Sequence, residues 1–426
     1  MRNVRTGILS TVLASTAAAL SCAAAAFSLT PQSSQPSRPA CNGVEGYAAA
    51  FGGRRTFFLK PDQLIAIKAV RETDPVVSAA YRQLLKQADA ALLRRPGAVT
   101  DKTTLPPSGD RHDYLSIAPY WWPDPANPQG PYVRRDGVIN PARETDAYDR
   151  TAIGSLSGDV RVLALAYYYS DDVRYATKAA QLIRTWFLDP ATAMNPNANF
   201  AQAVRGREDG RAEGVLDTSA FQSVVDAVGL LAPSRAITSD EQKALERWFG
   251  RYVDWMLTNR NGRAEQAARN NHGIWFDSQI TQYALFARRP EVALKVVDQF
   301  PARRISAQMD VDGRLPAETA RTRSFHYSIY ALTPAYDVAE MAGCLGRDLW
   351  GYRDAQGRGL RKATDFLAAY RGQLEKWPYK ELKLEPNELN GLLTRASWAW
   401  GPGSYPRTVN GYPAALEYRS DAQVVR

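Results

Sequence analysis

The stretch AIGSLSGDVRVLALAYYYSDDVRYATKAAQLIRTWF, residues 152–187, indicates the fold class of this chain. Apolar residues recur at helical spacing over 152–168 and again over 173–187, and the polar residues 170–172 lie between them as a turn and helix cap. Two helices joined by so short a polar connection favour antiparallel packing. The stretch therefore predicts a helical hairpin.

Similar helical patterns continue along the chain. They cover 62–93, with a break at Pro75, and then 218–231, 239–257, 274–286, 291–300, 327–341 and 360–374. No sustained two-residue alternation bounded by hairpin turns is present. So many helices exceed a four-helix bundle, and no strict repeat supports a solenoid. We therefore expect an all-α fold, an (α/α)n toroid or incomplete barrel of antiparallel helix pairs.

Two long irregular stretches interrupt the helices. Residues 96–147 are rich in Pro, Asp and aromatic residues, and residues 189–217 are rich in Asn, Gly and Arg. Connections of this length are usually functional or disordered. Their aromatic and Asn content favours ordered, functional loops. The last stretch, 377–426, could close the barrel or cap a groove.

The amino terminus predicts an export signal. Residues 1–5 are positively charged, residues 8–20 form a short apolar run, and small residues follow. This order is typical of a secretory signal peptide, and the run is too short to span a membrane comfortably. We expect a signal peptide over 1–26, a flexible leader over 27–46 and a single α/α-barrel domain over 47–426. The protein would be periplasmic or secreted, with a lipoprotein modified at Cys22 as the alternative.

The composition excludes several classes of protein. A hydrophobic fraction of 45% with 23% charged residues argues for a globular chain rather than a disordered one. Three cysteines exclude a disulfide-rich scaffold and a Cys-based zinc site. After removal of the signal, Cys41 and Cys344 remain and could form one bridge, although sequence cannot show that they are close. No other segment is long and apolar enough to span a membrane.

The net charge bears on the partner. It is +9, and it becomes +7 without Arg2 and Arg5, which suits a polyanionic ligand. The basic residues are spread along the chain, and the sequence carries no nucleic-acid motif, phosphate loop or metal-binding motif. We therefore expect a monomer that needs no metal and no cofactor and binds no nucleic acid.

The first candidate functional group is Asn270-Asn271-His272, directly before an apolar helical pattern. It places two amides and an imidazole at a helix N-terminus, where unpaired N–H groups and a partial positive charge favour a carboxylate. An Asn cap followed by a structural His explains the pattern equally well.

The second group is Arg321, Arg323, His326 and Tyr327. Arginine can grip a carboxylate through two hydrogen bonds, and nearby cations could push the phenol of Tyr327 toward its ionised form. The alternative is an ion-paired helix start, with Glu318 bound to one arginine and His326 only orienting Tyr327.

The third group lies in the two irregular stretches. Trp121 and Trp122 suit stacking on sugar rings, although core packing is expected for at least one of them. We expect Trp122→Ala to raise the KM for a polymer. The residues that we place along a substrate groove are His112, Tyr114, Tyr120, Trp121, Trp122, Asn199, Gln202 and Arg205, together with Asn270.

These segments together resemble the alginate-lyase superfamily, polysaccharide lyases with an α/α-barrel fold. The resemblance rests on NNH at 270–272, RTRSFHY at 321–327, HDYLSIAPYWWPDP at 112–125 and NPNANFAQA at 195–203, and it spans roughly residues 60–345. It implies cleavage of a 1,4-linked uronan such as polymannuronate or glucuronan. The spacing of the two arginines differs slightly from that of the best-known mannuronate-cleaving members, which leaves open which arginine faces the substrate.

The chemistry of β-elimination fits these residues. Loss of the proton at C5 requires the neighbouring carboxylate to be neutralised, for which Asn271, His272 and one of Arg321 and Arg323 are suited. In mannuronate and glucuronate the C5 proton and O4 lie on the same face, so Tyr327 could act as base and then as acid. Guluronate needs a second base, for which His272 is the candidate. No metal is required for this scheme.

Two other functions also fit the sequence. An α/α-barrel glycoside hydrolase needs two carboxylates, and Asp113, Asp217, Asp277 and Glu318 are present. A non-catalytic protein that binds acidic glycans would use the aromatic and arginine side chains but not Tyr327. The products separate these functions, because only a lyase leaves an unsaturated sugar that absorbs ultraviolet light.

Overall fold

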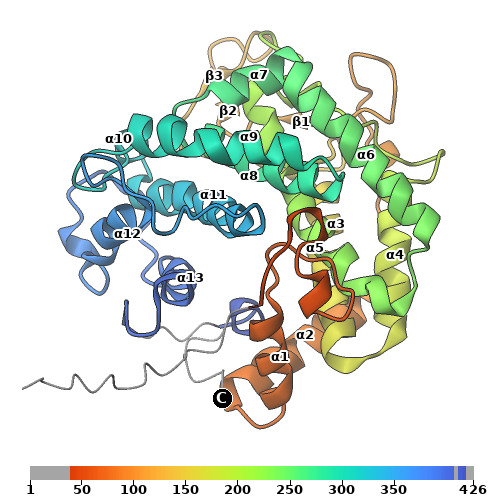
Figure 1. Cartoon of the computed structure of the whole chain (residues 1–426). Helices are drawn as coiled ribbons and strands as arrows, with labels where there is room; N and C mark the ends of the chain where they lie inside the picture. The colour runs from red at the N-terminus through yellow and green to blue at the C-terminus, as the bar shows by residue number, and fades with distance from the viewer. Residues whose placement is uncertain (1–38, 407–410, 419–426) are drawn as a thin grey trace, which may run out of the picture. The chain divides into compact units, whose positions relative to one another are not determined.

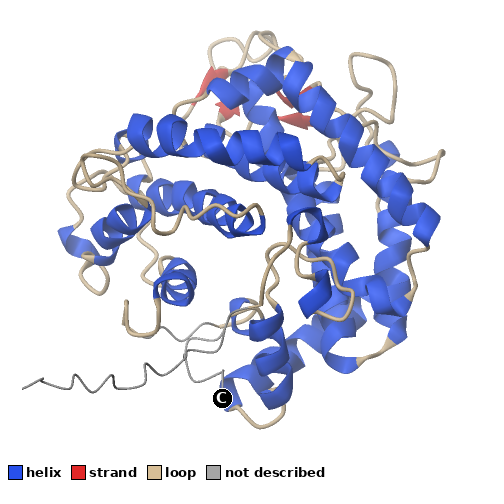
Figure 2. Ribbon diagram, viewed as in Figure 1, coloured by secondary structure: helices blue, strands red, loops and turns tan. Residues whose placement is uncertain are grey.

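The computed structural model describes residues 39–406 and 411–418. The expected signal peptide and the leader up to residue 38 lie outside the described residues. Helices dominate the described part, as Figures 1 and 2 show. In chain order they are α1 (Pro61–Val70), α2 (Pro75–Leu93), α3 (Arg150–Ser170), α4 (Val173–Phe187), α5 (Phe221–Leu231), α6 (Ser239–Thr258), α7 (Arg260–Ala267), α8 (Asn271–Phe286), α9 (Pro290–Phe300), α10 (Pro316–Thr319), α11 (Ser324–Cys344), α12 (Leu360–Ala368) and α13 (Asn390–Trp400).

The helical patterns in the sequence are confirmed in most places. α4 has the expected bounds, and Asp74 caps α2 directly before Pro75, because its carboxylate accepts hydrogen bonds from the backbone N–H groups of Val76 and Val77. α12 ends at Ala368, earlier than expected, and a turn with Gly372 at φ 76° follows it. Helices α7, α10 and α13 were not expected.

The helices pack as pairs. In the turn between α3 and α4, Asp171 adopts the left-handed conformation and the Asp172 side chain accepts a hydrogen bond from the backbone of Arg174. α3 packs against α4 and α5, and α8 packs against α9 and α11 (Figure 1). α8 is buried along nearly its whole length. The expected all-α fold of antiparallel helix pairs is therefore confirmed.

The two irregular stretches are ordered, as expected. Strand β1 (Leu115–Ile117) in the first stretch pairs in parallel with β4 (Phe200–Ala203) in the second. Within the first stretch, β2 (Trp121–Trp122) pairs antiparallel with β3 (Val133–Arg134). A 3-10 segment, Ala212–Ala220, then leads from the second stretch into α5. The pairing of β1 with β4 thus joins the two irregular stretches to each other.

The first described residues are tied to the helices. Cys41 forms a disulfide with Cys344, at the end of α11. The backbone oxygen of Val44 accepts a hydrogen bond of 2.5 Å from Nε of Arg55, and Glu45 forms an ion pair with Arg288. Residues 39–46, which fall in the expected leader, are therefore attached to the helical domain.

The segment Ala212–Ser234 is long and apolar enough to pass a test for a membrane span, contrary to the sequence expectation, but 72% of its most apolar window is buried inside the protein. A buried core helix passes the same test. The apolar character of this segment is explained by its place in the core, where Phe221 packs edge-to-face against Trp248.

Candidate active site

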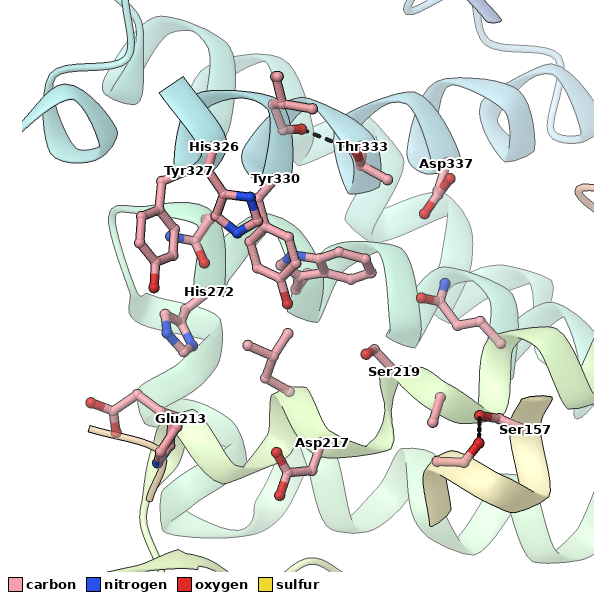
Figure 3. Close-up of a pocket in the computed structure, with 18 of the residues that line it drawn as sticks. Ser157, Glu213, Asp217, Ser219, His272, His326, Tyr327, Tyr330, Thr333 and Asp337 are labelled. Atoms are coloured by element: carbon pink, nitrogen blue, oxygen red, sulfur yellow. Dashed lines mark hydrogen bonds between the residues drawn. The ribbon is translucent and has the colours of Figure 1, made fainter. Parts of the chain in front are cut away.

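A cavity of about 1380 Å³ lies among α3, α5, α7, α8, α11 and α13. All of the residues predicted to be catalytic line it, and so do four of the predicted substrate-binding residues. Figure 3 shows His272 from α8 and Tyr327 from α11 directed into the same space. The sequence-predicted residues that line the cavity are Tyr120, Trp121, Gln202, Asn270, Asn271, His272, Arg321, Arg323, His326 and Tyr327.

His272 is held at the start of α8 by two neighbours. The Asn270 side chain accepts a hydrogen bond from the His272 backbone N–H, and Nδ1 of the imidazole lies 2.6 Å from Oε1 of Glu265 on α7. Burial lowers the pKa of His272, but the carboxylates of Glu265, Glu213 and Glu318 together outweigh burial and raise it overall. Because Nδ1 is bound to Glu265, Nε2 is the ring nitrogen that can face a ligand.

Asn271 is fixed by Glu318. One oxygen of Glu318 accepts a hydrogen bond of 2.6 Å from the Asn271 backbone N–H, and the other accepts one of 2.7 Å from Nδ2. The amide oxygen of Asn271 is buried without a hydrogen-bond partner among the described residues. Burial raises the pKa of Glu318. Glu318 thus holds the amide, whereas the sequence alternative had it bonded to an arginine.

Tyr327 lies between a second tyrosine and an arginine. Its hydroxyl and that of Tyr120 share a hydrogen bond of 2.5 Å, and Cζ of Arg321 lies 3.8 Å from the centre of its ring. Burial and the Tyr120 hydroxyl raise the pKa of Tyr327, and Arg321 only partly opposes them. The nearby cation thus pushes the phenol toward its ionised form, as expected, but burial and Tyr120 outweigh it.

The two arginines have different partners. Arg321 donates hydrogen bonds of 2.9 and 3.3 Å to Asp136, in the loop after β3. Nε of Arg323 lies 3.7 Å from Glu381, and this buried nitrogen has no hydrogen-bond partner in the described part of the chain. Asp136 therefore orients the guanidinium of Arg321 beside Tyr327. The guanidinium of Arg323 has a donor, Nε, that bonds to no described residue.

His326 faces a different neighbour from the one expected. Its Nδ1 bonds to Glu388, and its ring stacks on Tyr330 at 5.8 Å between centres and 18° between planes. The ring of Tyr327 meets His326 edge-on at 5.3 Å. His326 therefore contacts Tyr327 through its ring and not through a hydrogen bond.

Tyr114 and His112 do not line the cavity. Tyr114 is fully buried, and its hydroxyl donates to Asp217 at 3.1 Å. Nδ1 of His112 lies 2.6 Å from the backbone oxygen of Ala193, which joins the two irregular stretches. Their polar groups hold the loops together, and their assignment as substrate-binding residues stays a prediction.

Three further predicted binding residues lie outside the cavity. The side-chain oxygen of Asn199 accepts a hydrogen bond of 2.9 Å from the indole of Trp255. The indole of Trp122 donates to the backbone of Val138, and Arg205 donates to a glutamine side chain in the loop between β2 and β3. Of the two tryptophans placed along the groove, Trp121 lines the cavity and Trp122 does not.

Gln202 supports the cavity wall. It has a positive φ of 52°, its backbone N–H donates to Ser116, and its side chain donates to Asp217 at 3.0 Å. A positive φ is unfavourable for a residue other than glycine. At Gln202 the hydrogen bonds of the backbone N–H and of the side-chain amide hold the backbone in this conformation.

Several lining residues were missed by sequence reasoning. They are Glu265, Arg143, Arg150, Arg211 and Tyr330. Glu265 lies seven residues before His272 on the short polar helix α7, whose sequence carries no apolar face to mark it. Arg143 and Arg150 come from the end of the first irregular stretch and the start of α3, where ordinary surface arginines are common.

The four carboxylates that the sequence offered for a hydrolase are not gathered in the cavity. Of Asp113, Asp217, Asp277 and Glu318, only Asp217 lines it. Asp277 forms a buried ion pair of 2.6 Å with Arg304. Among residues 39–406 and 411–418, no group of three or more His, Cys, Asp or Glu side chains is placed to hold a metal ion.

Comparisons with known proteins agree with this geometry. Residues 98–377 match the family model for alginate lyases. The crystal structure of an alginate lyase from Bacteroides ovatus is 36% identical with a TM-score of 0.80, and the match covers 85% of this chain and 99% of that one. Comparison with the curated proteins gives no match.

More distant structures show the same fold. Alginate lyase A1-III from Sphingomonas species A1 is 17% identical with a TM-score of 0.51, and the match covers 85% of this chain and 97% of that one. A structure of an A1-III variant complexed with a tetrasaccharide is 16% identical with a TM-score of 0.52, covering 85% and 96%. The chain is therefore a polysaccharide lyase with an α/α toroid fold and belongs to the alginate lyase family.

Proposed function

We propose that this lyase cleaves a 1,4-linked uronan, polymannuronate or glucuronan, by β-elimination in the cavity between α8 and α11. The observation that carries the proposal is the convergence of Asn271, His272, Arg321 and Tyr327 on one space. A phenol, an imidazole, an amide and a guanidinium are the groups that the reaction needs. The name of the Bacteroides ovatus relative supports alginate as one substrate to test.

The first requirement is to neutralise the carboxylate of the reacting sugar. Nδ2 of Asn271 donates one N–H to Glu318 and has a second N–H, while Nε2 of His272 can donate when its ring is charged. The raised pKa of His272 favours that charged form. Donors fixed before the reaction stabilise the negative charge that builds up as the C5 proton leaves.

The second requirement is a base that becomes an acid. In the proposed step the phenolate of Tyr327 takes the C5 proton, the C4–O4 bond breaks, and a double bond forms between C4 and C5. The proton then passes from Tyr327 to O4 of the leaving sugar. The hydroxyls of Tyr120 and Tyr327 share a hydrogen bond that raises the pKa of Tyr327, which makes its phenolate a stronger base once it forms.

The structure favours Arg321 as the arginine at the reacting sugar. It lies against the ring of Tyr327 and lowers the pKa of that phenol, and Asp136 fixes its orientation. Arg323 lines the same cavity, but its nearest acidic partner among the described residues is Glu381. We therefore expect Arg321→Ala to lower kcat more than Arg323→Ala does.

The proposal is tested by following the absorbance of unsaturated uronate with polymannuronate, polyguluronate and glucuronan, with and without a chelator. We expect a signal on polymannuronate or glucuronan that persists with chelator and falls by at least about a hundredfold in Tyr327→Phe. Tyr352→Phe, outside the cavity, is the matched control. A folded wild-type protein that leaves all three polymers intact would contradict the proposal.

We also propose that the protein is exported and that residues 1–26 are removed. The disulfide between Cys41 and Cys344 supports this, because such bonds persist in oxidising compartments. Mass spectrometry of the protein recovered from the periplasm or medium gives the new N-terminus. A chain that keeps Met1 and stays in the cytoplasm would contradict the export proposal.

A further inference from the structure

The cavity extends well beyond the residues of the proposed elimination. Thr333 and Asp337 follow Tyr327 along α11, and Figure 3 shows them on the side of the cavity away from His272. Tyr327 and Asp337 are ten positions apart on this helix, which corresponds to about 15 Å along its axis. We call the part of the cavity around Asp337 the inner lobe. The residues that form its wall are Phe58, Ser157, Arg161, Ser223, Asp226, Thr333, Asp337, Arg395, Glu417 and Tyr418.

The two arginines of the inner lobe already have carboxylate partners. Nε of Arg161 donates a hydrogen bond of 2.7 Å to Glu417. The guanidinium of Arg395 lies 2.7 Å from Asp337 and 3.0 Å from Glu340, a fully buried residue behind the wall. The positive charge of both arginines is therefore compensated within the protein.

Asp226 adds a third carboxylate to the wall. Its oxygens accept hydrogen bonds from the backbone N–H groups of residues 57–59 and from the side chain of Gln282, all of them uncharged donors. Burial raises the pKa of Asp226 to about 6, so it is ionised at neutral pH. Three carboxylates and two guanidiniums thus line the inner lobe. A carboxylate that entered it would meet an excess of negative charge.

The reaction end of the cavity has the opposite balance of charge. Six arginines line it, Arg134, Arg143, Arg150, Arg211, Arg321 and Arg323, against the four carboxylates Glu213, Asp217, Glu265 and Glu388. A uronate is therefore favoured at the reaction end and disfavoured in the inner lobe.

The uncharged polar groups of the inner lobe are acceptors. The hydroxyls of Ser157, Ser223 and Thr333 donate to backbone oxygens of their own helices at 3.1, 3.0 and 3.0 Å. A hydroxyl has one hydrogen, so each of these oxygens keeps only lone pairs for a ligand. The side chains of all three residues are partly exposed to the cavity. Such a wall matches O–H donors, which a sugar carries, better than it matches a carboxylate.

Two aromatic residues complete the wall. Phe58 belongs to the segment that Asp226 holds, and Tyr418 is fixed by Lys60, whose Nζ donates a hydrogen bond of 2.9 Å to its hydroxyl. Aromatic rings with a few placed polar groups are typical of small-molecule sites. The rings offer contact to the apolar C–H face of a sugar.

We propose that the inner lobe binds an uncharged sugar, a few positions away from the reacting uronate on the same chain. Hydroxyls of this sugar donate to the acceptors of the wall, and no carboxylate enters the excess of negative charge. The inference rests on the proposed function and goes beyond it: the preferred substrate is a polymer in which neutral sugars accompany the uronates, and a pure uronan is cleaved more slowly.

Partial reduction of a uronan to neutral alcohols tests the inner lobe. A half-reduced polymer offers uronates and neutral sugars in random order, and tandem mass spectrometry of the products gives the sugar at each position from the new ends. We expect a neutral sugar in about nine of ten products at one fixed position, as for a tenfold preference. An even distribution at every position except the reacting one would overturn the inference and leave the proposed function intact.

The variant Glu417→Gln ties the preference to the inner lobe. It leaves the guanidinium of Arg161 without its carboxylate, so a uronate becomes acceptable there. We expect the tenfold preference for a neutral sugar to fall below about twofold. Glu45→Gln is the matched control, because Glu45 forms an exposed ion pair with Arg288 away from the cavity. The control should keep the preference.

The variant Thr333→Val tests the acceptors and keeps every charge. It removes one hydroxyl at nearly constant shape, and we expect the preference to fall about threefold, the effect of one hydrogen bond. Thr177→Val is the matched control, because Thr177 donates to the backbone oxygen of Val173 at 3.0 Å on the exposed face of α4. Preferences that stay tenfold in both Glu417→Gln and Thr333→Val would overturn the inference.

Binding keeps the test independent of turnover. Calorimetry in the Tyr327→Phe background compares a tetrauronate with two analogues, in which the two sugars at one end or at the other are reduced. We expect one analogue to bind at least about tenfold more tightly than the tetrauronate, and Thr333→Val to diminish this gain. Weaker binding of both analogues would overturn the inference. A gain in a protein that cleaves no uronan would support the inner lobe and contradict the proposed lyase reaction.

Discussion

At the scale of single residues, burial and the Tyr120–Tyr327 hydrogen bond together raise the pKa of the proposed base, Tyr327. Burial is the largest cause of the raised pKa of Tyr327, and the Tyr120 hydroxyl adds to it. A phenol with a raised pKa is a strong base but is seldom ionised near neutral pH. The rate of elimination should therefore rise with pH through the alkaline range.

Tyr120→Phe removes the hydroxyl that raises the pKa of Tyr327. We expect the rise of kcat/KM with pH to move to lower pH in this variant, because the phenolate forms more readily. The measurement is the pH profile of product absorbance for both proteins. An identical profile would show that Tyr120 does not influence the ionisation of the base.

The Glu265–His272 pair predicts a dependence of stability on pH. Because the folded-state pKa of His272 is raised, the stability that the pair contributes is fully present below the unfolded value near 6.5 and is lost as pH rises through the folded value. Glu265→Gln should thus destabilise the protein more at pH 6 than at pH 9. Urea unfolding at both values measures this, and an equal loss at both would contradict the prediction.

Trp121 and Trp122 allow a direct comparison of two neighbouring residues of the same type. Trp121 lines the cavity and Trp122 does not, although they are adjacent in β2. We expect Trp121→Ala to raise the KM for polymer by several-fold, about 1 kcal/mol of lost ring contact, and Trp122→Ala to change KM little. Steady-state kinetics of both variants measures the two KM values. A larger effect at Trp122 would contradict the placement of Trp121, and not Trp122, at the substrate.

At the scale of elements, α6 begins with a capping box. Thr238 accepts a hydrogen bond from the backbone of Glu241, and Glu241 accepts one from the backbone of Thr238. Arg184 on α4 also bonds to Glu241 and is the main cause of its low pKa, about 2. One carboxylate therefore both starts α6 and joins it to α4.

Glu241→Gln should lower the free energy of unfolding by about 1 kcal/mol at neutral pH. Since the pKa of Glu241 is lowered in the folded state, its contribution is present above the unfolded value near 4.5 and is lost as pH falls toward 2. Unfolding curves of wild type and variant should therefore converge in acid. A difference that stays constant with pH would mean that the charge of Glu241 is not involved.

At the scale of the whole molecule, the disulfide closes a very long loop. Cys41 and Cys344 are 303 positions apart, and the bond fixes the first described residues to the end of α11. We expect Cys41→Ser/Cys344→Ser to lose about 2–4 kcal/mol of stability and to keep kcat, because neither cysteine lines the cavity. Denaturant unfolding and the lyase assay measure the two effects. Loss of kcat with unchanged stability would contradict this account.

The described C-terminal segment also joins distant parts of the chain. The backbone oxygen of Leu416 accepts a hydrogen bond of 2.6 Å from Tyr169 on α3, and Glu417 pairs with Arg161. Tyr418 donates to Glu340 on α11. Residues 411–418 therefore connect α3 and α11, and Ala414, Glu417 and Tyr418 line the cavity.

The sequence by itself determined the helices and the chemistry of α8 and α11. Helical periodicity is local, so the α3–α4 hairpin could be recognised from residues 152–187 alone. The groups NNH at 270–272 and Arg321 to Tyr327 could be recognised because amide, imidazole, guanidinium and phenol groups of the right kind follow one another closely.

Only the tertiary structure decided which partners those groups have. Glu265 reaches His272, Glu318 reaches Asn271 and Tyr120 reaches Tyr327 across connections whose course no local pattern specifies. The same is true of Arg143 and Arg150, which resemble surface arginines in the sequence and line the cavity in the fold. Burial and pairing depend on contacts between distant segments, and these contacts set the pKa values and the free hydrogen-bonding groups of the site.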